Sequence, residues 1–421
     1  MKRRSTKALT ATTLATALFV TGCSTKAADS SDSGAGDGDV KTDVGVTDDE
    51  INLLELSDLS GVFKTIGLAY GAGIKVWTDE VNAAGGICDR KINVITQDTV
   101  YKVENAVPLY EQHKGNAAAM IGLGGSHILA ALKQKITTDN MLTVPGSWAS
   151  LNLDSPAVLM VGQTYDIEML NGLSYLQEQG MISDGDTIGH IYTDSEYGQN
   201  GIMGSKAYAK QHDMTIVEVP LSASDTDLTA SITKLKSDGV TAIAITTPPA
   251  ALGSAAVQNV QQGLNVPIVG SSPAFAPTLL TDPGVEAALS NFYMTSSAVP
   301  IGADNPKAQE ILGKIQQFSQ DEPNIGSILS YTWGLAYAAV LEQACEDGDM
   351  TRAGIIEAKG KVDSVESENL SGALDFTQPG APTSRETYIL QPDKSTPGLL
   401  TVTADLFASD EAKEYKAPHE E

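Results

Sequence analysis

The sequence predicts an α/β fold of two doubly wound lobes, each built on a parallel sheet, and two observations carry the prediction. Short apolar runs alternate with segments of helical spacing from residue 51 to residue 270, which is the pattern of βα units in parallel sheets. The alternation ends near residue 163 and then restarts, so we expect two lobes. Ligands of such sheets bind beyond the carboxyl ends of the strands, which predicts a ligand cleft between the lobes.

The first set of elements is expected between residues 51 and 162. Its strands are short Val-, Ile- and Leu-rich runs, and its helices show apolar side chains at three- and four-residue spacing. The expected strands are 51–56, 91–97, 118–123, 141–144 and 158–162, and the expected helices are 64–84, 103–113 and 127–138.

The second set begins at residue 167, and a less regular segment follows residue 271. We expect the charged tail, residues 411–421, to fray. The expected strands are 187–192, 215–219, 241–246, 267–270, 292–296 and 387–391, and the expected helices are 167–179, 198–212, 228–237, 250–263, 306–319, 328–344 and 353–359.

Composition excludes several classes of function. The 421 residues include 53 acidic and 27 basic side chains, a formal net charge of −26, and such a surface repels nucleic acid and anionic lipid. Aromatic residues make up only 5% of the chain, so a large stacking platform is not expected. The five histidines and three cysteines show no metal-ligand spacing, so we expect neither a metal site nor a cofactor.

The N-terminus has the layout of an export signal. A basic start and a short apolar run end in Val20-Thr21-Gly22-Cys23, which predicts a signal peptide over residues 1–22. The last four residues resemble a bacterial lipobox, so we expect a lipid such as palmitate on Cys23 and anchoring to the outer face of the membrane. An ordinary secretory signal with a coincidental cysteine is the alternative. Residues 23–45 lack apolar periodicity and are expected to form a disordered tether.

Two cysteines remain in the body of the exported chain, Cys88 and Cys345. Exported proteins favour disulfides, but spacing alone does not show whether two Cα atoms lie close enough. One disulfide and two free buried thiols both stay open at this point.

The segment from Ala118 to Lys133 gives the clearest indication of a site. An apolar run ends in Gly124-Gly125-Ser126 and is followed by helical spacing, which predicts a strand, a tight turn and a helix with Ser126 as its N-cap. The first N–H groups of a helix lack intrahelical partners, so this corner suits a carboxylate or another anion. The bland alternative is an ordinary capped βα turn.

Several segments together resemble bacterial leucine/isoleucine/valine-type solute-binding proteins. The order and spacing of these segments make the resemblance specific, and it extends from about residue 45 to residue 406. With the lipobox, it implies the tethered receptor of an ABC importer. The segments are Ser60-Gly61, residues 82–91, Gln97-Asp98, residues 121–126, residues 194–198, residues 225–227 and residues 263–270.

The resemblance implies a type I periplasmic-binding-protein fold that closes on its ligand like a clamshell. It places three hinge crossovers near residues 162–165, 296–300 and 374–376. Cys345 then falls in the same lobe as Cys88, which favours the disulfide. We expect a monomer that delivers a small solute to a membrane permease. The implied lobes are residues 46–163 with 300–373, and residues 164–299 with 374–410.

The resemblance also implies which residues meet the ligand. Family amino-acid receptors hold a carboxylate with a serine after the third strand, here Ser126. They grip the ammonium with an acid after the strand ending at Gly270, where this chain has Ser271-Ser272-Pro273. Two family tyrosines fall on Ile66 and on Pro248 or Pro249. The candidate ligand-binding residues are Ser60, Phe63, Ser126, Ser147, Trp148, Ser150, Tyr197, Pro249, Ser272 and Phe275.

The half of the site that would bind an ammonium is therefore missing, since an ammonium buried without a counter-charge is costly. We expect a small polar solute, either an amino acid or a related carboxylate or amide with an apolar part. Asp58 or Glu196 could replace the missing acid. Interlobe packing is the alternative role for Trp148 and Phe275.

An enzyme and a ligand-sensing receptor domain are the two other possible functions. An enzyme is not expected, because no Gly-x-Ser-x-Gly elbow and no P-loop occurs, and Ser126 and His127 would point in different directions on a helix start. A ligand-sensing receptor domain that works with a membrane signalling partner is the remaining alternative.

Overall fold

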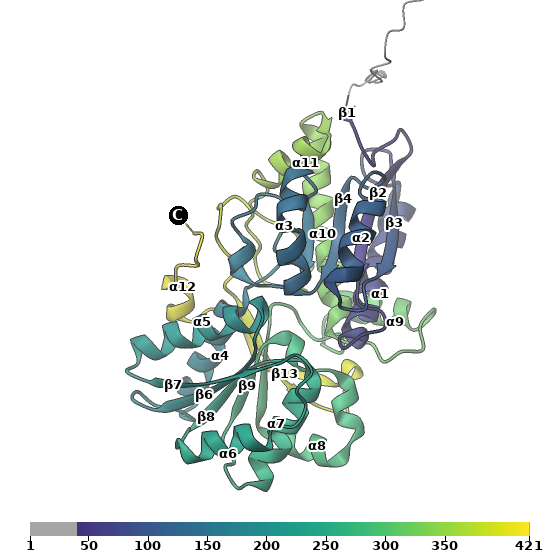
Figure 1. Ribbon diagram of the computed structural model, residues 1–421. Helices are drawn as coiled ribbons and strands as arrows, with labels where there is room; N and C mark the ends of the chain where they lie inside the picture. Colours follow the sequence, from purple (N-terminus) through teal and green to yellow (C-terminus); the bar gives the residue numbers. More distant parts are fainter. Residues whose placement is uncertain (1–39, 421) are drawn as a thin grey trace, which may run out of the picture. The chain divides into compact units, whose positions relative to one another are not determined.

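The computed structural model describes residues 40–420 (Figure 1). The predicted signal peptide, the lipidation residue Cys23 and most of the predicted tether lie outside the described residues. No helix of the described part of the chain is long and apolar enough to span a bilayer.

The first sheet has four parallel strands in the order β3-β2-β4-β5, and helices pack around it (Figure 1). Its central strands β2 and β4 are mostly buried because apolar side chains occupy both faces, whereas the edge strand β3 is mostly half-buried or exposed. Helix α1 packs against α10, and α2 packs against α3. The elements are β2 (Glu50–Ser57), α1 (Lys64–Ala84), β3 (Lys91–Asp98), α2 (Val103–His113), β4 (Ala119–Gly124), α3 (Ser126–Thr138), β5 (Thr143–Gly146) and α10 (Ile325–Glu346).

The second sheet has seven strands in the order β13-β12-β10-β9-β8-β6-β7. Strands β6 to β10 are parallel, while β12 and β13 form an antiparallel edge. The elements are α4 (Tyr165–Glu178), β6 (Thr187–Thr193), α5 (Glu196–Gln211), β7 (Thr215–Leu221), α6 (Thr229–Ser237), β8 (Ala242–Thr246), α7 (Pro249–Gln261), β9 (Ile268–Gly270), α8 (Pro283–Ala288), β10 (Phe292–Ser296), β12 (Thr387–Pro392) and β13 (Leu400–Phe407).

The chain passes between the two sheets three times, which confirms the two-lobed α/β prediction. The passages lie between β5 and α4, between β10 and α9, and between α11 and β12. Helices α9 (Pro306–Ile315) and α11 (Arg352–Lys359) pack beside α1 and α10, respectively, and so belong with the first sheet. The exact domain boundaries stay a prediction.

Two links fasten the ends of the first lobe. A disulfide joins Cys88, in the turn after α1, to Cys345 near the end of α10, with Cα atoms 6.0 Å apart. Of the two alternatives that the cysteines left open, the structure therefore has the disulfide. A short parallel pair, β1 (Lys41–Thr42) with β11 (Asp349–Met350), ties the start of the described chain to the segment before α11.

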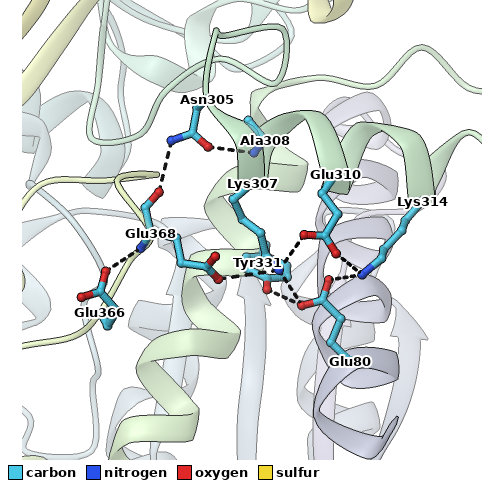
Figure 2. Close-up of polar contacts among 9 residues, drawn as sticks. All are labelled: Glu80, Asn305, Lys307, Ala308, Glu310, Lys314, Tyr331, Glu366 and Glu368. Atoms are coloured by element: carbon cyan, nitrogen blue, oxygen red, sulfur yellow. Dashed lines mark hydrogen bonds and ion pairs between the residues drawn. The ribbon is translucent and has the colours of Figure 1, made fainter. Parts of the chain in front are cut away.

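An ion-pair cluster joins helices α1, α9 and α10 (Figure 2). The Lys307 ammonium lies 2.9 Å from Glu80 and 3.2 Å from Glu310, and Lys314 contacts both carboxylates at 2.6 Å. The Tyr331 hydroxyl donates to Glu80 at 2.5 Å. Because the Lys307 side chain is only 11% exposed, this network is screened less than a surface pair and holds α9 in place.

Two predictions about strands are wrong, and three strands were not predicted. Residues 158–162 form a single bridge, from Val158 to Thr143, rather than a strand, because this segment leaves the sheet for the crossing to α4. Strand β5 begins at Thr143 rather than at residue 141. The short strands β1 and β11 and the alternating strand β13 were not predicted.

The charged tail does not fray over the described residues. It forms α12 (Asp410–Glu414), and the Arg385 guanidinium binds the carbonyls of Ala412 and Tyr415 and the carboxylate of Glu420 at 2.6–2.9 Å. The charges that predicted a solvated tail are the groups that fasten it.

Candidate functional site

A small chamber lies where the carboxyl ends of the strands of both lobes meet. We call it the inner chamber. Its volume is about 30 Å³, which accommodates little more than a water molecule. Its lining residues are Ser57, Asp58, Phe63, Ile66, Gly67, Tyr70, Tyr101, Gly124, Gly125, Ser126 and Gly146 from the first lobe and Tyr165, Tyr197 and Pro273 from the second.

A larger outer groove, of about 700 Å³, lies beside the inner chamber. The two spaces share three aromatic residues, Phe63, Tyr101 and Tyr197. Phe63 and Tyr101 are in contact, with ring centroids 4.7 Å apart. Aromatic rings from both lobes therefore separate the inner chamber from the outer groove.

The first-lobe wall of the chamber is the start of helix α3. Gly125 precedes the helix at φ 102°, a conformation that favours glycine, and a Cβ there would lie 2.9 Å from the Tyr101 ring. The prediction that Ser126 is the N-cap is wrong, because Ser126 is the first helical residue and no side chain caps α3. The first N–H groups of α3 therefore lack a capping acceptor beside the chamber.

The Ser126 hydroxyl lies 2.5 Å from the hydroxyl of Ser147, and both side chains are buried. The two serines thus meet across the ends of β4 and β5. Helix N-termini favour negative charge, so hydroxyl and amide donors converge here on a corner suited to an anion.

Asp58 is the only carboxylate among the residues that line the chamber. Its oxygens accept backbone N–H groups of Ser60, Gly61 and Phe63 at 3.3, 2.5 and 2.8 Å. The carboxylate is 2% exposed and fixes the loop that leads into α1. Asp58 therefore holds its own loop and also places a carboxylate in the chamber wall, so the prediction that it replaces the missing acid stays open.

Four tyrosines line the chamber: Tyr70, Tyr101, Tyr165 and Tyr197. Burial raises the pKa of each, so all four stay neutral hydroxyl donors. The rings of Tyr165 and Tyr197 are 4.6 Å apart, and the Tyr197 hydroxyl lies 2.6 Å from Ser271 Oγ. Low aromatic content gave no hint of this gathering, since composition does not show where residues meet.

Glu168 of α4 lies directly behind the second-lobe wall. Its Oε1 accepts the Ser272 hydroxyl at 2.9 Å, and its Oε2 accepts the Ser272 N–H at 3.4 Å. Pro273, the next residue, lines the chamber. Burial raises the pKa of Glu168 to about 8, so its carboxyl is largely protonated at neutral pH.

The candidate residues from the sequence fall into three groups: residues that line the chamber, residues directly behind it, and residues that do neither. Phe63, Ser126 and Tyr197 line the chamber, while Ser147 and Ser272 lie directly behind it, in contact with Ser126 and Glu168. The other five, which do not line the chamber, are Ser60, Trp148, Ser150, Pro249 and Phe275.

Each of these five has a structural partner or place. Ser60 donates to Asp98 at 2.6 Å, and Ser150 donates to Asp166 at 2.6 Å. Trp148 donates its indole N–H to the Val161 carbonyl at 3.1 Å, and Phe275 packs against Phe292. Pro249 is the first residue of α7. The alternative role was interlobe packing: the Trp148 ring lies 6.0 Å from the Tyr165 ring of α4, whereas the contact of Phe275 with Phe292 lies within the second lobe.

Sequence reasoning missed Tyr70, Tyr101, Tyr165 and Glu168. Two of them had a usable signal: Tyr70 shares a helix face with Phe63 and Ile66, and Tyr101 follows the end of β3. Tyr165 and Glu168 begin α4 after a crossing, where no strand-end rule applies. Among the described residues, no group of three or more His, Cys, Asp or Glu side chains could hold a metal ion.

Comparisons with known proteins agree with this fold. A solved fatty acid ABC transporter substrate-binding protein from Thermomonospora curvata is 31% identical, with a TM-score of 0.86 over 90% of this chain and 98% of that chain. A branched-chain amino acid ABC transporter protein from Thermus thermophilus with bound valine is 15% identical, with a TM-score of 0.76 over 88% and 99% of the two chains.

A solute-binding protein from R. palustris in complex with 4-hydroxybenzoate is also 15% identical, with a TM-score of 0.72 over 86% of this chain and 98% of that chain. A search of curated protein sequences finds no match. Residues 50–397 match the family described as periplasmic binding protein. The chain therefore belongs to the periplasmic binding protein family, a family of solute-binding receptors.

Proposed function

We propose that the protein binds a monocarboxylate with an apolar or aromatic body and delivers it to an ABC permease. One observation carries the proposal: the uncapped start of α3, with Ser126, opens on a chamber walled mainly by aromatic and aliphatic side chains. An anion gains from the helix start, and the rest of the ligand gains from apolar burial.

The same chamber argues against an α-amino acid. Its one lining carboxylate, Asp58, already accepts three backbone N–H groups, and Glu196 is not among the lining residues. An ammonium would therefore have to share Asp58 with these three N–H groups. The 31% identical relative, named for fatty acids, supports an apolar carboxylate.

Ligand entry requires the lobes to move apart. Ligand pockets usually measure several hundred Å³, whereas the chamber measures about 30 Å³. We propose that the lobes open about the three crossings, admit the solute through the outer groove and close on it. Closure then presents a distinct surface to the permease.

We propose further that the mature protein is a monomer held at the outer face of the membrane by a lipid on Cys23. The sequence Val20-Thr21-Gly22-Cys23 supports the lipidation, and a tether of about twenty residues would allow the receptor to reach dissolved solute. Mass spectrometry of the purified protein should find an acylated Cys23 as the first residue. An unmodified Cys23 or cleavage at another residue would contradict the anchor.

A thermal-shift screen tests the ligand class. The chain from residue 24 onward is heated with octanoate, benzoate, their amides, leucine and valine. We expect one of the carboxylates to raise the melting temperature, because ligand at a hundred times its dissociation constant adds about 2.7 kcal/mol of stability. The amides are the matched control for charge. A shift with leucine or valine and none with the acids would overturn the proposal.

Uptake separates the importer from the sensor. Cells that carry the receptor and its permease should accumulate the labelled carboxylate, and deletion of the permease should abolish accumulation. Undiminished uptake after that deletion would favour a ligand sensor that works with a signalling partner.

A further inference from the structure

Glu168 is a buried carboxyl that the proposed carboxylate corner does not use. It lies in the first turn of α4, and the residue is 2% exposed. Its hydrogen bonds come from the side chain and backbone of one residue, Ser272. Buried carboxyls are usually paired with a cation, so this position requires an explanation.

The ionisable groups around Glu168 supply no positive charge. The charged group that acts on it is Asp166 of the same helix, and it opposes ionisation. The ionisable side chains influenced by Glu168 from neighbouring elements are Tyr70 of α1, Tyr165 of α4 and Tyr197 of α5. All three tyrosines line the inner chamber, whereas Glu168 itself is not among the lining residues, so the groups between Glu168 and the chamber include neutral tyrosines.

Ser272 connects Glu168 to the ligand space. It stands between Ser271, which contacts the Tyr197 hydroxyl, and Pro273, which lines the chamber. The resemblance placed the ammonium-binding acid after β9, where this chain has serines. The structure brings a carboxyl to those serines from α4 instead.

We propose that Glu168 determines the charge of the ligand: the protonated carboxyl admits an anion to the chamber, and the ionised carboxyl excludes it. The inference rests on the proposed function, because it requires an anionic ligand. A Glu168 carboxylate would add a negative charge behind the wall of a chamber that Asp58 already lines, and like charges repel strongly where little water screens them. A bound carboxylate should therefore hold the proton on Glu168, and a Glu168 carboxylate should weaken ligand binding.

The direction of the pH dependence follows from the protonation state. With a pKa near 8 in the free protein, Glu168 is neutral at pH 6.5 and ionised at pH 9.5. Binding of a carboxylate above pH 8 then requires uptake of a proton by Glu168. The dissociation constant should stay level from pH 6 to pH 7 and rise above pH 8, by at most about tenfold per pH unit.

Titration calorimetry on the chain from residue 24 onward tests this, with octanoate and benzoate as probes. Both acids are fully ionised above pH 6, so they contribute no proton. Titrations in two buffers of different ionisation enthalpy should show no proton exchange at pH 6.5 and uptake of close to one proton per ligand at pH 9. No uptake at pH 9 would overturn the inference while leaving the proposed function intact.

Substitution of Glu168 tests whether this residue takes up the proton when the ligand binds. In Glu168→Gln the ratio of dissociation constants at pH 9.5 and pH 6.5 should fall to near one, and proton uptake should disappear. The matched control is Glu55→Gln. Glu55 is a second buried carboxyl of raised pKa, about 7, which accepts a hydrogen bond from Thr96 beneath the first-lobe wall. Loss of the pH dependence in Glu55→Gln, with Glu168→Gln unchanged, would overturn the assignment.

Two further results have defined meanings. If neither probe binds at pH 6.5, the proposed function fails and the inference falls with it. If leucine binds and releases a proton at pH 7, Glu168 ionises to pair with its ammonium, which would contradict both proposals. The proton-uptake measurement needs no variant, so it holds even if Glu168→Gln folds poorly.

Discussion

The two walls of the inner chamber differ in whether their polar groups already have hydrogen-bond partners. The first-lobe wall contains the start of α3 at Ser126, where no side chain caps the first backbone N–H groups. In the second-lobe wall the polar groups bond one another: the Tyr197 hydroxyl contacts Ser271, and the Ser272 hydroxyl donates to Glu168. In the proposals above, the first-lobe wall binds the anion, and the protonation state of Glu168, behind the second-lobe wall, determines whether the anion binds. We infer that affinity and charge selection are divided between the lobes.

The largest expected effect comes from breaking the first wall at Gly125. Gly125→Ala places a Cβ 2.9 Å from the Tyr101 ring at a positive φ, which should distort the start of α3. We expect carboxylate affinity to fall by about a hundredfold or more, since the corner depends on backbone placement. Gly115→Ala is the matched control, because a Cβ there meets nothing within 4 Å. Equal affinities in calorimetry would place the anion elsewhere.

Ionisation of Glu168, behind the second-lobe wall, should lower the free energy of unfolding by an amount that depends on pH. The carboxyl of Glu168 titrates near pH 8 in the folded protein and near pH 4.5 when unfolded. Below pH 4.5 both states are protonated and no cost arises. Between these values the unfolded state loses its proton first, so stability declines as pH rises, by a few kcal/mol at most.

Glu168→Gln should remove that cost. The variant should gain stability over the natural protein at pH 8.5 and show little difference at pH 5, measured by urea unfolding. A gain that is the same at both pH values would show that packing, rather than ionisation, explains it.

Ser126→Ala should have an intermediate effect. It removes a hydroxyl beside the anion and leaves Ser147 without its partner at 2.5 Å. We expect carboxylate binding to weaken by roughly 1–3 kcal/mol, with the pH profile of binding unchanged, because the second wall is untouched. A changed pH profile measured by calorimetry would mean that the two walls are not separable.

The smallest effect should come from Ser60→Ala. Ser60 was a candidate ligand-binding residue, but its exposed side chain donates to Asp98 and does not line the chamber. We expect the dissociation constant to change by less than about twofold. A larger loss would show that the loop before α1 closes over the ligand.

The two walls also differ in how far the sequence could predict them. Apolar periodicity located nearly every helix and the core strands, because burial on both faces imposes it. The rule that ligands meet strand ends led to Ser126, and it would have led to Tyr101 after β3. These features are local in the chain, so a single sequence reveals them.

The second wall depends on long-range packing and was therefore missed. Glu168 and Ser272 meet across 104 residues, and no local pattern reports that contact. Strand-end reasoning likewise put Ser150 in the site, whereas the structure turns its hydroxyl to Asp166 of α4. The edge strand β13 and the docked charged tail were missed for the same reason, since tertiary partners override local composition.

The most direct test of the central claim compares leucine with 4-methylpentanoate, which is leucine without its ammonium, by calorimetry at pH 6.5. The one lining acid, Asp58, already accepts three backbone N–H groups, and the uncapped start of α3 suits a carboxylate. We predict that 4-methylpentanoate binds at least about tenfold more tightly, since an unpaired buried charge costs more than 1.4 kcal/mol. Tighter binding of leucine would contradict the account and identify the protein as an amino-acid receptor.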